Sequence, residues 1–260
     1  MISRHEQRRL RRERGMRRGV ALLPNLLTTA NMFCGFYAVL QAFNGKFTLA
    51  VWLIILASLF DFLDGRVARM TGTSSDFGVE YDSLADMCTF CMAPALLTYQ
   101  WGLKGFGNLG LAACFIYFCC GALRLARFNV QAGDIEKKDF QGLPSPAAAN
   151  TLTSYLLFHK QIFGLPKEPP IFLLVLVLFV AMLMVSNVRY KSAKSVQKRT
   201  NFFMLIGVVV LIVLIATKPN YTLFSFGICY ITFGLVGWIR ELRHPKAKPE
   251  NIEPNIDYSH

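Results

Sequence analysis

The stretch DFLDGRVAR, residues 61–69, lies where one long apolar run ends, and Gly78, Asp82 and Asp86 follow it where the next apolar run begins. Four carboxylates, those of Asp61, Asp64, Asp82 and Asp86, therefore lie at or near the edge of hydrophobic segments. Moving a carboxylate deep into a bilayer costs roughly 2.5–3.5 kcal/mol on insertion scales. Several carboxylates together also repel one another, so this arrangement requires a neutralising partner.

The spacing of these residues predicts that the carboxylates converge. Asp61 and Asp64 are three residues apart and Asp82 and Asp86 are four apart, so on a helix each pair shares one face. Two such faces can present all four carboxylates to one point. Clusters of oxygen ligands alone suit hard cations such as Mg²⁺ or Mn²⁺, whereas zinc and copper favour nitrogen and sulfur. The sequence thus predicts a divalent-cation site.

The rest of the chain predicts an all-α, polytopic membrane protein. Hydrophobic residues make up 53% of its 260 residues, and apolar runs recur at about the length needed to cross a hydrocarbon core. We find no internal repeat, and we expect one transmembrane domain over residues 21–239 and an exposed tail over 240–260. Eight spans are predicted, at about 21–43, 47–67, 81–101, 109–127, 145–163, 170–187, 202–216 and 221–238.

The basic residues are distributed unevenly about these spans. Of the 28 Lys and Arg residues behind the net charge of +12, 23 fall on the side of the Asp cluster and five on the other. The positive-inside bias places both termini and the Asp cluster on the cytoplasmic side, in what we expect to be a bacterial inner membrane. Because no basic stripe with interleaved aromatic residues appears, we expect no nucleic-acid partner. Nor does the N-terminus resemble a cleavable signal.

Residues 1–20 carry eight arginines, with Leu10, Met16 and Val20 interspersed. This pattern favours an amphipathic juxtamembrane helix on an anionic leaflet. The alternative is a disordered basic tail that only fixes the topology.

Written out, the opening stretch reads D-x2-D-G-x2-A-R-x8-G-x3-D-x3-D. It resembles the signature of the CDP-alcohol phosphotransferases, integral membrane enzymes that transfer a phospho-group from a CDP-linked donor to an alcohol with loss of CMP. Every position of that signature is present. The plainer alternative is a membrane hairpin that carries paired surface acids.

Two later segments resemble the phosphatidylserine synthase branch of this family: R-L-A-R-F-N at residues 124–129 and G-L-P-S-P-A-A-A at 142–149. This resemblance implies CDP-diacylglycerol as donor and L-serine as acceptor, with phosphatidylserine and CMP as products. Together with the signature it covers about residues 24–150. The resemblance also implies a homodimer, because dimers are common in the family.

The resemblance assigns the acidic residues to a two-metal site of Mg²⁺ or Mn²⁺. Asp61, Asp64 and Asp82 would hold the metals, and Asp86 would complete the site. We expect the third helix to begin near Tyr81, where the positive helix N-terminus favours an ionised Asp82. Asp86 is the candidate general base for the acceptor hydroxyl, or else a metal ligand only; a free aspartate, with a pKa of about 3.9, is a weak base.

Other residues are assigned to the substrates. Asn25, Thr28 and Asn31 recur at three-residue spacing after Pro24, which suits a first helical turn; they serve either as a polar stripe facing the Asp cluster or as caps and interhelix hydrogen bonds. Gly65, Ala68 and Gly78 lack bulk and allow the nucleotide to approach closely. Arg69 binds either phosphates or the acids. The donor-binding candidates are Asn25, Thr28, Gly65, Ala68, Arg69 and Gly78, and the acceptor or phosphate candidates are Arg124, Arg127, Asn129 and Ser145.

Several alternatives remain at this point. Arg124 and Arg127 can instead be snorkelling anchors. The acceptor can be glycerol 3-phosphate or an inositol phosphate, although these would require more basic groups. An ion-coupled transporter would place acids near the midplane and show internal symmetry. A noncatalytic lipid-binding homologue is disfavoured by the four intact aspartates. Cys88 and Cys91 lack a second ligand pair and are interpreted as packing residues.

Overall fold

The computed structural model describes residues 4–72, 75–132, 140–164, 171–190, 207, 210 and 213–243. Over these residues the fold is helical, as predicted, apart from one pair of two-residue strands. A π-helical turn, η1, and a 3₁₀ turn, η2, interrupt the α-helices. The elements are α1 (Arg4–Phe43), α2 (Phe47–Thr71), α3 (Asp76–Asp86), η1 (Met87–Met92), α4 (Ala93–Trp101), η2 (Leu103–Phe106), α5 (Asn108–Ala132), β1 (Phe140–Gln141), α6 (Ser145–Phe163), α7 (Ile171–Val185), β2 (Arg189–Tyr190) and α9 (Pro219–Arg243).

Several of these helices have the length and composition of membrane spans. Within the described residues four segments qualify, Leu22–Phe43, Phe47–Thr71, Asn108–Gln131 and Pro219–Arg240, and the apolar α7 is shorter. Large apolar side chains lie exposed on them, including Phe33 at 62% and Phe233 at 80%. A surface of this kind suits lipid rather than water. The chain is therefore a membrane protein with several spanning helices.

The remaining predicted spans coincide with other helices or lie beyond the described residues. The third corresponds to the run α3–η1–α4, the fifth to α6 and the sixth to α7. Most of the seventh, 202–216, lies outside the described residues. The total of eight spans therefore stays a prediction.

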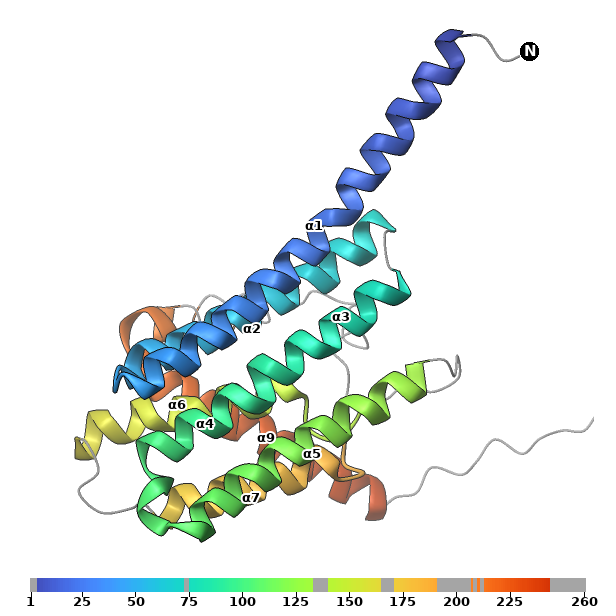
Figure 1. Ribbon diagram of the computed structural model, residues 1–260. Helices are drawn as coiled ribbons and strands as arrows, with labels where there is room; N and C mark the ends of the chain where they lie inside the picture. Colours follow the sequence, from blue (N-terminus) through green and yellow to red (C-terminus); the bar gives the residue numbers. More distant parts are fainter. Residues whose placement is uncertain are drawn as a thin grey trace, which may run out of the picture.

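Two predicted helix starts are wrong. The predicted first span, 21–43, agrees with the apolar segment Leu22–Phe43, but no new helix begins there: α1 is continuous from Arg4 to Phe43, with Pro24 in its interior rather than in its first turn. The N-terminal part of α1 extends beyond the other helices (Figure 1). Arginine is a good helix former, so the helix continues through the basic segment. That this segment lies on a membrane surface remains a prediction.

The second error concerns the third helix, which begins at Asp76 and not near Tyr81. Ser75 is its N-cap, and the Ser75 hydroxyl oxygen accepts a hydrogen bond from the Gly78 N–H at 3.1 Å. Asp82 is therefore in the second turn, and the helix N-terminus supports Asp76 instead.

The helices pack as neighbouring pairs. The most extensive contacts join α1 to α2, α5 to α7, and α6 to α9, and Figure 1 shows α3, η1 and α4 following one another as a nearly continuous run. Small residues allow close approach: a Cβ atom at Gly35 would collide with Thr89, and one at Gly121 would collide with Cys91. Both glycines pack against η1, so this turn is held from two sides.

The segment before α6 is anchored to the end of α7. Gly142 has φ +82°, and its N–H donates to the Val188 carbonyl at 2.9 Å. The Leu143 N–H donates to the Leu183 carbonyl at 3.0 Å, and β1 pairs antiparallel with β2. These bonds fix the start of α6, where Ser145 is fully buried.

Candidate active site

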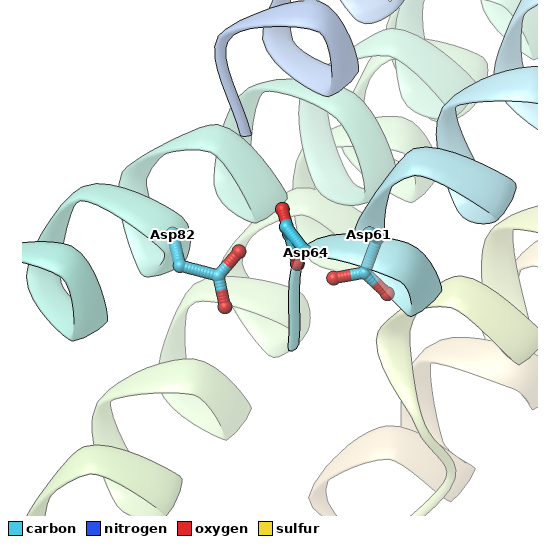
Figure 2. Close-up of side chains that lie close together, drawn as sticks. All are labelled: Asp61, Asp64 and Asp82. Atoms are coloured by element: carbon cyan, nitrogen blue, oxygen red, sulfur yellow. The ribbon is translucent and has the colours of Figure 1, made fainter. Parts of the chain in front are cut away.

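Three of the four aspartates form a compact cluster. Asp61 and Asp64 lie on α2 and Asp82 lies on α3, and one oxygen from each carboxylate lies within 4.8 Å of the other two. Figure 2 shows the three side chains directed toward one another from the two helices. Asp64 is buried, and Asp61 and Asp82 are half-buried. The three-residue spacing on α2 produces this convergence, as the sequence predicts.

The fourth aspartate lies beside this cluster rather than within it. Asp86 is one turn beyond Asp82, and its side chain contacts that of Asp61. The Asn31 carboxamide donates from Nδ2 to Asp86 Oδ1 at 3.4 Å. The prediction that all four carboxylates meet at one point therefore holds for three, with Asp86 as a direct neighbour.

The composition of the cluster fits a hard divalent cation. All of its ligand atoms are carboxylate oxygens, the type that Mg²⁺ and Mn²⁺ prefer. Asp82 Oδ1 is buried and has no hydrogen-bond partner among the described residues. Three adjacent carboxylates with an unused buried oxygen provide ligands for a cation and repel one another without one.

The polar residues of α1 reach toward these aspartates. The Thr28 hydroxyl lies 2.8 Å from Asp64 Oδ2 and is buried. The Thr29 hydroxyl is 2.9 Å from the Tyr81 hydroxyl, so α1 also contacts α3 beside the cluster. The polar stripe of α1 therefore both faces the aspartates and makes interhelix hydrogen bonds, because Thr28 bonds to Asp64 and Asn31 bonds to Asp86.

A cavity of about 240 Å³ opens beside the cluster. At Gly78 a Cβ atom would come within 3.5 Å of Asn25 Oδ1, and at Gly65 it would come within 3.4 Å of an Arg69 nitrogen. The absence of side chains at these two positions therefore keeps space beside polar groups. The lining of this cavity includes all six donor-binding candidates, Asn25, Thr28, Gly65, Ala68, Arg69 and Gly78, together with Asp64, Asp82 and Asn129.

The acceptor candidates divide into two groups. Arg124 donates from Nη1 to the Ser145 hydroxyl at 2.7 Å, and its charge interacts with that of Asp86. Asn129 lines the cavity and exchanges hydrogen bonds with Ser83. Arg127 is directed to the end of α7, where it donates to the Asn187 side chain at 2.7 Å and does not line this cavity. The structure thus places Arg124 and its partner Ser145 near Asp86, places Asn129 on the cavity wall, and joins Arg127 by hydrogen bonds to the end of α7. Acceptor binding by these residues, Arg127 included, stays a prediction.

Sequence reasoning missed some residues of the site. Ser75, Val79, Ser83 and Phe128 also line the cavity. Ser83 lies three residues before Asp86, so the helical spacing that grouped Asp82 with Asp86 also places Ser83 near this face. Phe128 lies inside the R-L-A-R-F-N segment, but an aromatic residue in a membrane helix carries no distinct signal.

Comparison with known proteins agrees with this geometry. The sequence profile of CDP-alcohol phosphatidyltransferases matches residues 21–185. A Helicobacter pylori (strain J99) protein named CDP-diacylglycerol–serine O-phosphatidyltransferase is 36% identical over 84% of this chain and 91% of its own length. A Methanocaldococcus jannaschii protein of the same name is 33% identical over 86% and 97%.

A third relative differs in name. An archaetidylserine synthase of Methanothermobacter thermautotrophicus is 37% identical over 65% of this chain and 69% of its own length. The region that the family profile matches, residues 21–185, contains the Asp cluster, the cavity and the start of α6. On these grounds the chain belongs to the CDP-alcohol phosphatidyltransferase family.

Proposed function

We propose that this protein transfers the phosphatidyl group of CDP-diacylglycerol to L-serine and releases CMP. The observation that carries the proposal is the cluster of Asp61, Asp64 and Asp82, two of which, Asp64 and Asp82, line a cavity that is also lined by all the donor-binding candidates. Relatives over most of the chain carry the name of this activity. No specific feature of the described residues favours another acceptor or ion transport.

The donor's cytidine diphosphate portion would occupy the cavity. Gly65, Ala68 and Gly78 leave room for it, and Arg69 offers a guanidinium group to its phosphates. Asn25 contributes polar atoms at the same wall, and Thr28 holds Asp64 in place. The diacylglycerol portion would remain in the surrounding lipid, next to the exposed apolar faces of the helices.

Asp61, Asp64 and Asp82 would hold Mg²⁺ or Mn²⁺, and we propose two ions with Asp86 completing the site. Bound there, the metal would neutralise charge that develops on the diphosphate. The helices α2 and α3 contribute position, since they hold one oxygen of each carboxylate within 4.8 Å of the other two.

The transfer requires one bond to form and one to break. The serine hydroxyl oxygen forms a bond to the phosphorus that carries diacylglycerol, and the bond from that phosphorus to the CMP oxygen breaks. Asp86 would accept the hydroxyl proton, with Asn31 fixing the orientation of its carboxylate. In the alternative, in which Asp86 only binds metal, the same phosphorus–oxygen bonds form and break. Arg124 and Ser145 would bind the acceptor's anionic group, and Asn129 would assist from the cavity wall.

We also propose eight spans, an amphipathic juxtamembrane segment over residues 1–20, and cytoplasmic placement of both termini and the active site in an inner membrane. The uneven distribution of Lys and Arg supports this orientation. A homodimer is proposed by analogy with the family.

The test is release of CMP by the purified protein in detergent with CDP-diacylglycerol and Mn²⁺ or Mg²⁺. L-serine, glycerol 3-phosphate and an inositol phosphate are supplied as separate acceptors. We expect release with serine only. Release with another acceptor alone would retain the role of the Asp cluster and overturn the choice of serine, whereas release with none would overturn the transferase itself.

A further inference from the structure

Asn31 occupies an unusual position beside Asp86. It is fully buried on α1, and its backbone carbonyl accepts a hydrogen bond from the Thr89 hydroxyl at 3.2 Å, which fixes α1 against η1. Its Nδ2 donates to Asp86 Oδ1, but its Oδ1 is buried and has no hydrogen-bond partner among the described residues.

The orientation of the Asn31 carboxamide follows from its neighbour. Only the NH₂ group can donate to a carboxylate, so Nδ2 must face Asp86 and Oδ1 must face elsewhere. An acceptor atom buried without a donor costs free energy, and native proteins retain one where a water or ligand completes it. The negative charge of Asp86 nearby favours a donor that is positively charged.

Arg124, which also interacts with Asp86, has an unused donor where Asn31 has an unused acceptor. Its Nη1 donates to Ser145, but its Nε is buried and lacks a partner within the described part of the chain. Its guanidinium interacts electrostatically with Asp86. Asn31 therefore has an unused acceptor, Oδ1, and Arg124 has an unused donor, Nε. Both side chains interact with the carboxylate of Asp86.

We propose that Asn31 Oδ1 is the subsite for the ammonium group of the acceptor and that Arg124 binds the acceptor's carboxylate. This inference rests on the proposed function and extends it: Asn31 determines specificity for an amino-bearing alcohol. The ligand class is a zwitterionic amino acid with a hydroxyl group. The ammonium donates to Asn31 Oδ1 and the carboxylate accepts from Arg124 Nε.

The test compares L-serine with 3-hydroxypropanoate, which keeps the hydroxyl and the carboxylate but lacks the ammonium. The measured quantity is kcat/KM for L-serine divided by kcat/KM for 3-hydroxypropanoate. We expect Asn31→Leu to lower this ratio by about tenfold or more, as loss of a charge-assisted hydrogen bond does. The KM for CDP-diacylglycerol should stay within about twofold, because Asn31 does not line the donor cavity.

Asn31→Asp provides the second variant, and it carries the test alone if leucine is not accommodated. It keeps an acceptor oxygen and adds negative charge, so the ratio should rise above that of the parent protein even if both rates fall. The matched control is Asn150→Leu. Asn150 is half-buried, and its Oδ1, like that of Asn31, lacks a partner among the described residues, but its Nδ2 donates to Ser58 and not to Asp86. This control should leave the ratio unchanged.

The outcomes separate the two proposals. If the parent protein uses serine and the Asn31 variants lower the rates for both acceptors equally, Asn31 only supports Asp86 and the ammonium subsite is wrong, while the proposed function stands. If the parent protein releases no CMP with serine, the proposed function fails and the subsite fails with it.

Discussion

Asp82 is the residue that joins α3 to the pair on α2, so its removal tests the metal site directly. Asp82→Asn keeps the size of the side chain but removes one of three convergent charges. We expect transfer activity to fall by roughly a thousandfold or more, as loss of a metal ligand predicts. CMP release measures this, and substantial residual activity would contradict the assignment. Asp76→Asn, in the first turn of the same helix, is the control and should remain active.

Thr28 tests whether α1 positions the cluster. Thr28→Val keeps the shape but removes the hydroxyl that lies 2.8 Å from Asp64 Oδ2. Loss of a hydrogen bond to a charged group predicts a decrease in kcat of about tenfold, together with a requirement for more Mn²⁺ to reach half-maximal activity. Thr98→Val is the control, because the Thr98 hydroxyl donates within its own helix to the Pro94 carbonyl. Equal effects of the two substitutions would show that Thr28 acts through packing alone.

At the scale of elements, close packing around η1 holds Asp86 in place. A Cβ atom at Gly35 would collide with Thr89 on η1, so α1 and η1 leave no room for a side chain at this position. We expect Gly35→Ala to lower the free energy of unfolding by about 1–3 kcal/mol. Thermal unfolding in detergent measures this. Gly237→Ala on α9, where a Cβ atom meets nothing within 4 Å, should be neutral or slightly stabilising. Similar melting temperatures for both variants would contradict tight α1–η1 packing.

Helix boundaries show where sequence reasoning succeeds and where it fails. The fifth span was predicted at about 145–163, and the structure agrees, since α6 runs from Ser145 to Phe163. The start of α3 was missed because the apolar pattern begins only near Tyr81, while the cap at Ser75 is a local polar signal. The π-helical turn was missed because its cause is packing between helices and not local residue preference.

At the scale of the whole molecule, the metal connects stability to activity. The repulsion among the three carboxylates should be relieved by a divalent cation. We expect EDTA to abolish transfer and lower the melting temperature, and Mg²⁺ or Mn²⁺ to restore both. Asp82→Asn should lose the metal-induced rise in melting temperature. A rise in this variant equal to that of the parent protein would place the stabilising metal elsewhere.

Prediction of the site depended on periodicity and on family resemblance. The helical spacing of Asp61 and Asp64 was sufficient to predict their convergence, and the signature pointed to Gly65, Ala68 and Gly78, all of which line the cavity. The pairing of Arg127 with Asn187 was not predictable, since it joins a residue of α5 to one just beyond α7, 60 positions apart in sequence. The same is true of the unused atoms of Asn31 and Arg124, which only the folded arrangement reveals.

The most direct test of the central claim is the fate of the serine oxygen. Serine labelled with ¹⁸O in its hydroxyl group is supplied with CDP-diacylglycerol and Mn²⁺, and the lipid product is analysed by mass spectrometry. If the serine hydroxyl attacks phosphorus at the Asp cluster, phosphatidylserine retains the label, CMP carries none, and Asp82→Asn yields no labelled lipid. Unlabelled phosphatidylserine, or labelled product from Asp82→Asn at the rate of the parent protein, would contradict the account.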